Sequence, residues 1–251
     1  MIIREPFFEE IKELKNLWSE AFGDTEAFIN LFFDSAFSLK RSRAVFVDGK
    51  PVSALYWFDC TCRGERIAYI YAVATLGAHR GEGLCTALMN DTHKHLSSIG
   101  YSGAVLVPGE KSLFDFYAKI GYIPATSISE LVVSASTEVD IREIDTGEYA
   151  EKRRLFLPEG AVIQEGENLN LLSSQAKFYT GDAFLLAARK EGKKLYALEF
   201  LGDKSKAPCI VASLGCKEGK FRTAGRERPF AMFIPLRDNI TPPTYFAFAF
   251  D

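Results

Sequence analysis

The 251-residue sequence lacks a long apolar run and an excess of positive charge. No apolar stretch approaches the roughly 18 residues of a membrane-spanning helix, and acidic residues occupy the amino-terminal region where a signal peptide would be apolar. Lys and Arg number 30 against 33 Asp and Glu, which gives a net charge of −3. This balance does not indicate a protein that binds nucleic acid or an anionic membrane. The sequence therefore predicts a cytoplasmic protein with neither of these partners.

Cysteines are few, five in all. Their number is odd, and the sequence contains no Cys-x-x-Cys pair and no His/Cys cluster with the spacing of metal ligands. We therefore expect reduced thiols, no disulfide framework and no metal site. Cys60 and Cys62 fall on one face of an expected strand, and Cys85 falls at an expected helix start. No His or Asn pattern supports a thiol nucleophile, so packing is the expected role of Cys85.

Aromatic residues are abundant, with 21 Phe and 10 Tyr, and apolar residues make up 47% of the chain. This ordinary globular composition predicts one large folded domain or two small ones. Core packing is the expected use of most rings, although Phe28 and Phe32 could also line an apolar cleft. Strand alternation places Tyr56 and Phe58 on one face and Trp57 on the other, so these three rings cannot line one cage.

Hydrophobic periodicity predicts alternating helices and strands before residue 135. In chain order, the expected elements are helices over 7–22 and 25–37, a hairpin about Asp48-Gly49, a doubly apolar strand over 66–75, a glycine-rich loop over 76–82, a helix ending before Gly100, a short strand, a helix over 111–120, and one or two strands over 122–135.

A polar stretch then favours a division near residue 140, after which the order loosely repeats. The expected elements there are helices over 148–157 and 168–179, a hairpin about Glu191-Gly192, and strands over 229–236 and 244–250. The sequence therefore predicts an α/β (α+β mixed-sheet) protein with two domains.

The strand, loop and helix between residues 66 and 98 indicate a phosphate-binding unit. A glycine-rich turn at a helix start exposes backbone amides that have no intrahelical partner, and the helix dipole adds positive charge there. Gly81 and Gly83 allow close approach of the backbone, and Arg80 supplies a forked donor. On pattern alone, an ordinary strand-to-helix turn remains an alternative.

Two segments carry more specific motifs. The first is Val73-Ala74-Thr75-Leu76-Gly77-Ala78-His79-Arg80-Gly81-Glu82-Gly83-Leu84-Cys85, and the second is Tyr117-Ala118-Lys119-Ile120-Gly121-Tyr122. The first resembles motif A of the GNAT superfamily of N-acetyltransferases, Arg/Gln-x-x-Gly-x-Gly/Ala, with Cys85 as a mild departure. The second is similar to the family's Tyr-x-Lys-x-Gly-Phe. The resemblance covers roughly residues 1 to 135.

The resemblance implies an acyl-CoA N-acyltransferase fold with acetyl-CoA as co-substrate. In this family the strand before the loop separates from its neighbour, and its free backbone groups bind the pantetheine arm like an added strand. The loop and the helix start hold the diphosphate. The cofactor-binding residues that the resemblance implies are Val73, Ala74, Thr75, Arg80, Gly81, Glu82, Gly83, Leu84, Cys85 and Thr86.

The resemblance also implies that Tyr117 is a general acid that protonates the departing thiolate. The reaction would be direct attack by the primary amine of a small molecule or peptide. The proton acceptor is left open among Asp59, Glu65, the carboxylates of Asp251 and water.

Among GNAT proteins, the chain is most similar to the tandem acetyltransferases of the enhanced-intracellular-survival type. We therefore expect a catalytic N-acetyltransferase domain over 1–138 and a degenerate acetyltransferase-like domain over 139–251, with oligomeric state left open. One alternative is a non-catalytic module that binds acyl-CoA or a protein, and another is a transferase that uses a different acyl donor.

Two further features are not expected to bind a ligand. Arg222-Thr223-Ala224-Gly225 loosely resembles the phosphate loop, but Pro229 blocks a following helix. His93 and His95 are expected to lie near a helix end, where cations interact favourably with the dipole, and to point to different faces.

Overall fold

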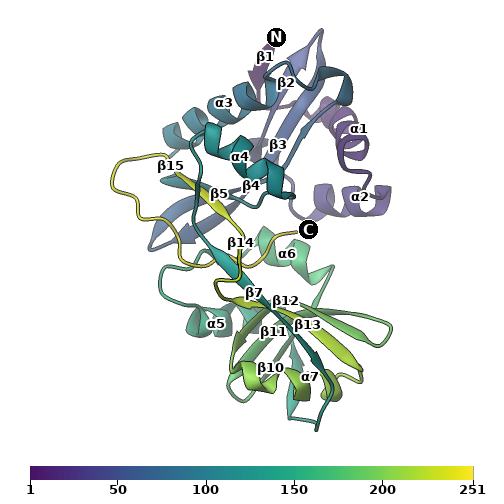
Figure 1. The fold of residues 1–251 in the computed structure, drawn as a ribbon. Coiled ribbons are helices and arrows are strands. Elements are labelled where there is room, and N and C mark those ends of the chain that lie inside the picture. Colours follow the sequence, from purple (N-terminus) through teal and green to yellow (C-terminus); the bar gives the residue numbers. More distant parts are fainter. Residues whose placement is uncertain (251) are drawn as a thin grey trace. The chain divides into compact units, whose positions relative to one another are not determined.

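The computed structural model describes residues 1–250, which fall into two compact units. Unit 1 consists of residues 1–123 and 232–242, and unit 2 of residues 124–231 and those from 243 onward (Figure 1). Each unit is thus built from two separate stretches of chain. The expected division at residue 138 lies inside the first stretch of unit 2, so a single cut there does not separate the units.

Unit 1 contains a mixed sheet with the strand order β1-β2-β3-β4-β5-β15-β6. Strands β4 and β5 are parallel, whereas β1–β2, β2–β3, β3–β4 and β5–β15 are antiparallel. The strands are β1 (Ile2–Arg4), β2 (Ser42–Val47), β3 (Lys50–Cys62), β4 (Glu65–Thr75), β5 (Gly103–Leu106), β6 (Ile123–Pro124) and β15 (Met232–Pro235). The helices are α1 (Ile11–Phe22), α2 (Glu26–Ser35), α3 (Leu84–Ser98) and α4 (Lys111–Lys119), with 3₁₀ turns over Phe8–Glu10, Leu39–Arg41 and Gly77–His79.

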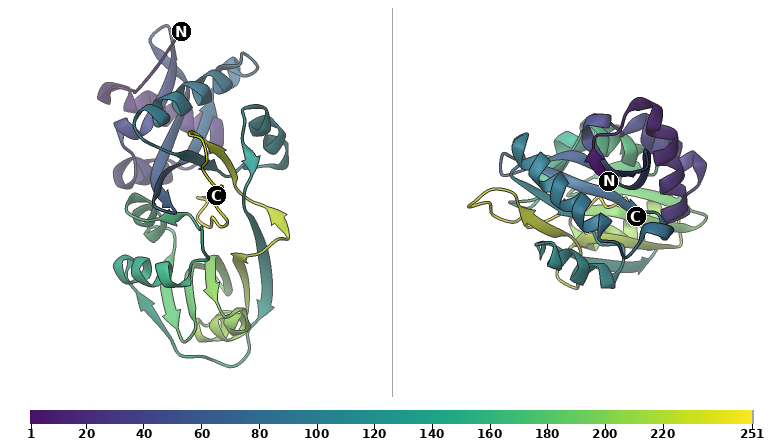
Figure 2. Two further views of the ribbon diagram at one scale, coloured as in Figure 1. Left: turned by 90° about the vertical axis from the view of Figure 1, so that its left-hand side faces the viewer. Right: turned by 90° about the horizontal axis from the view of Figure 1, so that it is seen from above.

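The two helix pairs of unit 1 cover opposite faces of its sheet (Figure 2). Trp57 packs in the core beneath α3 and α4, whereas Tyr56 and Phe58 meet the rings of α1 and α2. This confirms the predicted alternation of the three rings along β3. On this face the rings of α2 and β3 are in contact, since the ring centroids of Phe32 and Tyr56 lie 5.3 Å apart.

Local sequence signals account for the hairpin and the helix ends in this unit. Asp48 and Gly49 both have positive φ angles, 50° and 78°, as the predicted tight turn requires. Gly23 ends α1 in the left-handed conformation, and the Thr25 hydroxyl accepts a hydrogen bond from the amide of Phe28 at the start of α2. The predicted hairpin and second helix are therefore confirmed.

Strand β15 joins the sheet of unit 1 from the far end of the chain. It pairs with β5, and the ring of Phe233 lies over Gly103, where a Cβ would be 2.4 Å from that ring. The predicted strand over 229–236 is in fact split. Arg228 and Pro229 form β14 in unit 2, and only Met232–Pro235 belong to β15.

Unit 2 contains a sheet with the order β14-β7-β13-β12-β11-β10-β8. Strands β12 and β13 are parallel, whereas β8–β10, β10–β11, β11–β12, β7–β13 and β7–β14 are antiparallel. Helices α5 and α6 pack on one face and α7 on the other. The elements are β7 (Ser127–Ser134), β8 (Ile141–Ile144), α5 (Thr146–Phe156), β9 (Ile163–Gln164), α6 (Glu167–Ser173), β10 (Lys177–Gly181), β11 (Phe184–Glu191), β12 (Lys194–Gly202), a 3₁₀ turn (Lys204–Lys206), α7 (Ala207–Ser213), β13 (Glu218–Ala224) and β14 (Arg228–Pro229).

The helix predicted over 168–179 is too long. Helix α6 ends at Ser173, and strand β10 begins at Lys177. Phe178 and Tyr179 pack into the cores on opposite faces of the sheet, which is the alternation of a strand buried on both sides. Two successive large apolar residues fit a buried helix as well as such a strand, so periodicity could not separate the two.

The strand predicted over 244–250 is absent, although Tyr245 to Ala249 are buried as expected of a core segment. An isolated bridge joins Ala161 and Tyr245. Further along, the Phe248 amide donates to Gln164 Oε1 at 3.2 Å, and Gln164 Nε2 donates to the Phe248 carbonyl at 2.9 Å. A side-chain amide thus takes the place of a neighbouring strand.

A buried ion pair holds the same segment inside unit 2. Arg153 Nε donates to Glu199 at 2.7 Å, and the two side chains are 2% and 0% exposed. The hydroxyls of Tyr149 and Tyr245 also donate to this carboxylate, at 2.7 and 3.2 Å. The guanidinium of Arg153 lies 4.5 Å from the centroid of the Phe248 ring.

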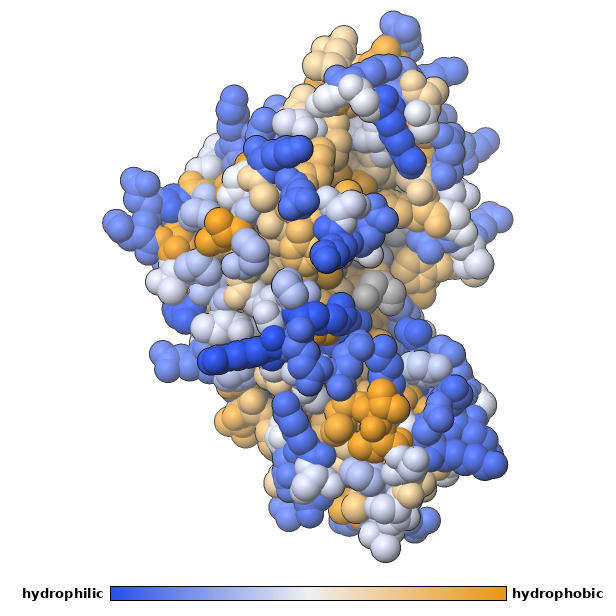
Figure 3. Space-filling model, viewed as in Figure 1, coloured by the Kyte–Doolittle hydropathy of each residue, from blue (hydrophilic) through white to orange (hydrophobic). Residues whose placement is uncertain are grey.

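Within residues 1–250, no helix is both long and apolar enough to cross a membrane. Figure 3 shows a mostly hydrophilic face, with an apolar patch over the strands that Figure 1 labels β7 and β13. On β7, the side chain of Val132 is largely exposed.

Candidate active site

Strand β4 extends well beyond its pairing with the short strand β5. The paired residues of β4 are Ile67 to Tyr69, and β5 ends at Leu106, whereas β4 continues to Thr75. On the other side, the register with β3 shifts between Tyr71 and Ala74, and Ala72 has a φ of 48°. A bulge with a non-glycine residue in the left-handed region is a strained feature that bends a strand. It lies beyond the last residue pair between β4 and β5.

Beyond the bulge, some backbone groups of β4 point toward β3 and others point toward the opposite edge of the strand. The Leu76 amide donates to the Val52 carbonyl on β3 at 2.9 Å, and Ser53 Oγ donates to the Ala74 carbonyl at 2.7 Å. Backbone groups of successive residues point to opposite edges of a strand, so Thr75 directs its amide and carbonyl away from β3. Its carbonyl accepts a hydrogen bond from Arg80 Nε at 3.1 Å. The expected role of Val73 toward a pantetheine arm remains a prediction.

The loop after β4 is open and is held by side chains of the loop itself and of α1. Gly81 and Gly83 have φ angles of 84° and 77°, and a Cβ on either would meet nothing within 4 Å. Glycine is needed here for backbone conformation rather than for lack of space. The Gly77 amide donates to Glu20 Oε1 at 3.0 Å, and the Glu82 carboxylate lies 3.3 Å from His79 Nδ1.

Helix α3 starts directly after this loop, so its first-turn amides face the open side. Leu84 anchors the turn in the core, whereas Cys85 and Thr86 are half-buried. Burial raises the pKa of the Cys85 thiol to about 11, which keeps it neutral at physiological pH. A neutral thiol suits the predicted packing role better than that of a nucleophile.

Tyr117 of α4 lies in the same core as Leu84 and Cys85 and is 8% exposed. Its ring centroid is 5.8 Å from that of Tyr122, with the rings at 66°. Burial, together with the nearby Cys85 thiol, raises the pKa of Tyr117 well above its ordinary value near 10. The phenol is therefore protonated at neutral pH.

The sequence did not predict a hydrogen bond made by Tyr122, whose ring packs against Tyr117. His93 Nε2 and the Tyr122 hydroxyl lie 2.9 Å apart, and both side chains are buried. Burial lowers the pKa of His93 to about 4. His93 is thus neutral, and the interpretation of this residue as a cation at the helix end is wrong. No sequence signal could reveal the contact, because the partners are 29 residues apart.

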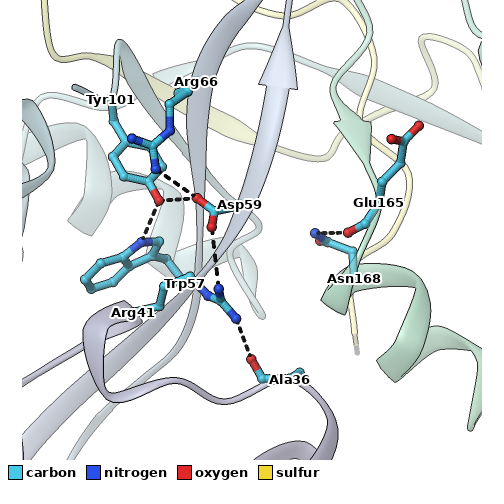
Figure 4. A network of polar contacts seen from close by, with 8 residues as sticks. All are labelled: Ala36, Arg41, Trp57, Asp59, Arg66, Tyr101, Glu165 and Asn168. Carbon is cyan, nitrogen blue, oxygen red and sulfur yellow. Dashed lines mark hydrogen bonds and ion pairs between the residues drawn. The ribbon is translucent and has the colours of Figure 1, made fainter. Parts of the chain in front are cut away.

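Asp59 and Glu65 are both engaged by other side chains. Asp59 accepts from the Tyr101 hydroxyl and from Arg41 at 3.5 Å and Arg66 at 3.4 Å (Figure 4). Glu65 accepts from Ser102 Oγ at 2.5 Å and pairs with Arg237. Asp251, the third carboxylate left open by the sequence, lies outside the described residues.

The segment Arg222-Thr223-Ala224-Gly225 lies in and just after strand β13, not in a loop before a helix. A Cβ on Gly225 would be 1.9 Å from Ser129 Oγ, so strand packing explains the glycine. Within residues 1–250, no group of three or more His, Cys, Asp or Glu side chains is arranged to hold a metal ion.

Comparison with known families supports this arrangement. Residues 3–125 match the model of the acetyltransferase (GNAT) domain. These residues form a GNAT acetyltransferase domain. The match ends before β15, so this strand, which lies between β5 and β6 in the sheet, comes from outside the matched residues. A search of curated proteins found no match to the chain.

Solved structures show the same fold over most of the chain. A GCN5-related N-acetyltransferase from Anabaena variabilis is 14% identical with a TM-score of 0.74, covering 94% of this chain and 73% of that one. Eis1 from Mycobacterium abscessus is 14% identical with a TM-score of 0.70, covering 94% and 74%. A tandem GNAT protein from the clavulanic acid biosynthesis pathway is 9% identical with a TM-score of 0.56, covering 95% and 100%.

Proposed function

We propose that the protein is an N-acetyltransferase that moves an acetyl group from acetyl-CoA to a primary amine of a small molecule or peptide. One observation carries the proposal. Strand β4, which continues beyond its pairing with β5, leads into two positive-φ glycines and a helix start, and a buried, protonated tyrosine lies in the same core.

The cofactor-binding residues divide by the part of acetyl-CoA that each would meet. The open edge of β4 at Val73 to Thr75 suits an extended amide chain, which pairs with a strand edge. The amides of residues 81–86 suit a diphosphate at the start of α3. Arg80 adds positive charge beside these amides. Its Nε donates to the Thr75 carbonyl, and its Nη groups lie on an exposed side chain.

In the proposed reaction, a neutral amine nitrogen forms the new C–N bond while the thioester C–S bond breaks. The phenol of Tyr117 gives its proton to the departing sulfur, and its raised pKa keeps that proton available through neutral pH. The amine proton passes to water or to a carboxylate. Glu65 is poorly placed for this, since it precedes Val73 by a distance along β4 of roughly 26 Å at 3.3 Å per residue.

Calorimetric titration with acetyl-CoA tests the proposed binding site. We expect micromolar binding by the unaltered protein and at least about tenfold weaker binding by Gly83→Val. Valine is disfavoured at a φ of 77°, so the loop must change its backbone conformation at a cost of roughly 1–2 kcal/mol or more.

Gly64→Val is the matched control for this titration. Gly64 has a φ of 78°, and a Cβ there also meets nothing within 4 Å, but it lies in the β3–β4 turn at the other end of β4. Equal binding by both variants, or no binding by the folded protein, would contradict the proposal. Binding without acetyl transfer to any amine would favour a non-catalytic acyl-CoA-binding module or a different acyl donor.

A further inference from the structure

The hydroxyl of Tyr122 is unusual for its position. It ends the motif Tyr-x-Lys-x-Gly-Phe, in which the final ring has no polar atom, and here the side chain is 2% exposed. Burying a hydroxyl without a partner costs about 1–3 kcal/mol. In this protein the partner is His93 Nε2, at 2.9 Å. The extra hydroxyl and the buried histidine therefore form a matched pair.

Tyr122 also contacts Tyr117 in two ways. Its amide donates to the Tyr117 carbonyl at 3.1 Å, because Gly121 turns the chain back with a φ of 105°. Its ring packs edge-on against the ring of Tyr117. Tyr122 thus contacts Tyr117 through both its backbone and its ring.

His93 connects Tyr122 to helix α3. It belongs to α3, whose first turn contains Leu84 and Cys85 in the same core as Tyr117. The hydrogen bond joins two neutral groups, since burial lowers the pKa of His93 and raises that of Tyr122. It acts through geometry and stays intact at physiological pH.

We propose that His93 and Tyr122 are positioning residues that fix the phenol of Tyr117 relative to α3. The proposal rests on the general-acid role proposed for Tyr117. Placement matters because a misplacement of about 1 Å in a catalytic group can cost up to a hundredfold in rate. The hydrogen bond holds the tyrosine that donates the proton in register with the helix start that holds the diphosphate.

Steady-state kinetics of four single variants test this role. Thiol release from acetyl-CoA is measured with spermidine, kanamycin and a lysine-containing peptide as amine probes. For Tyr122→Phe and His93→Leu we expect kcat to fall about tenfold, while KM for acetyl-CoA stays within about twofold, because the binding loop is untouched. His93→Gln retains a polar partner for Tyr122 and should recover most of the rate. Tyr149→Phe is the control, since it removes an equally buried, hydrogen-bonded hydroxyl from unit 2.

A double variant separates positioning from general loss of stability. If Tyr122 acts only through Tyr117, then Tyr122→Phe lowers kcat in the unaltered protein but not in a Tyr117→Phe background. Calorimetric binding of acetyl-CoA and the circular dichroism spectrum identify any variant that fails to fold, and His93→Gln then carries the comparison.

The possible failures are distinguishable. If Tyr117→Phe is impaired but Tyr122→Phe and His93→Leu match the unaltered protein, the positioning role is wrong and the proposed function stands. If Tyr122→Phe lowers kcat equally in both backgrounds, its role is structural and the inference is overturned. If Tyr117→Phe retains full activity, or the unaltered protein acetylates none of the probes, the general-acid role and the inference both fall.

Discussion

Burial decides the charge of His93. The side chain is 8% exposed, and its pKa falls from an ordinary value near 6.5 to about 4. The unfolded chain therefore binds a proton between these two pH values that the folded protein does not. By linkage, the contribution of His93 to stability is complete above pH 6.5 and is lost as the pH falls toward 4.

This linkage predicts a stability difference between two proteins. From pH 6.5 to pH 4, we expect the unaltered protein to lose about 3 kcal/mol more unfolding free energy than His93→Gln, in which residue 93 cannot titrate. Urea unfolding at several pH values measures it, and other titrating groups cancel in the comparison. Parallel pH dependences would contradict this account, because they would show that His93 has the same pKa in the folded and unfolded states.

For single residues, the sequence motifs predicted some of the candidate site residues but not the tertiary contacts that these residues make. Gly81, Gly83 and Tyr117 belong to patterns that are visible in the sequence. Ala72 gives no signal, because alanine is not a residue that usually marks a positive φ angle. The His93–Tyr122 bond is a tertiary contact between separate elements, which local periodicity does not encode.

Among the elements, local signals succeeded where a turn or cap determines the structure. Asp48-Gly49 forms the predicted tight turn, and the Thr25 cap lies at the start of the predicted second helix. The signals failed where tertiary partners decide. The segment after Tyr245 has the apolar residues of a strand but is held by the Gln164 side chain. The sequence pattern around Phe178 did not show that α6 had ended and that strand β10 had begun.

Strand β15 gives a prediction about truncation. A fragment of residues 1–138 lacks β15, which leaves the edge of β5 without its antiparallel partner and removes the buried side chains of Met232 and Phe233 from the sheet. Removing large buried side chains costs several kcal/mol each, a sizeable part of a domain's stability. We expect this fragment to show no cooperative thermal unfolding transition.

The full chain is the control for that experiment, measured by calorimetry under the same conditions. A fragment that unfolds cooperatively would mean that unit 1 does not need β15. The sequence predicted a strand near residue 232 but not that it returns to unit 1, because strand pairing partners are not readable from alternation alone.

For the molecule as a whole, the two units are joined by chain crossings rather than by one linker. Unit 1 includes 232–242, and unit 2 resumes at 243. The assignment of residues 139–251 as a degenerate acetyltransferase-like domain remains a prediction, as do the cytoplasmic location and the identity of the acceptor. One tandem GNAT structure shares the fold over 95% of this chain.

The most direct test of the central proposal follows the acetyl group itself. The full chain and Tyr117→Phe are each incubated with acetyl-CoA labelled in the acetyl group and with spermidine, kanamycin or a lysine-containing peptide, and products are analysed by mass spectrometry. We expect labelled amide and free CoA in equal amounts from the unaltered protein, and a rate lower by roughly 100-fold from Tyr117→Phe, which has lost the acid. Labelled amide formed at the same rate by both proteins would contradict the role of Tyr117, and no labelled amide with any amine would contradict acetyl transfer.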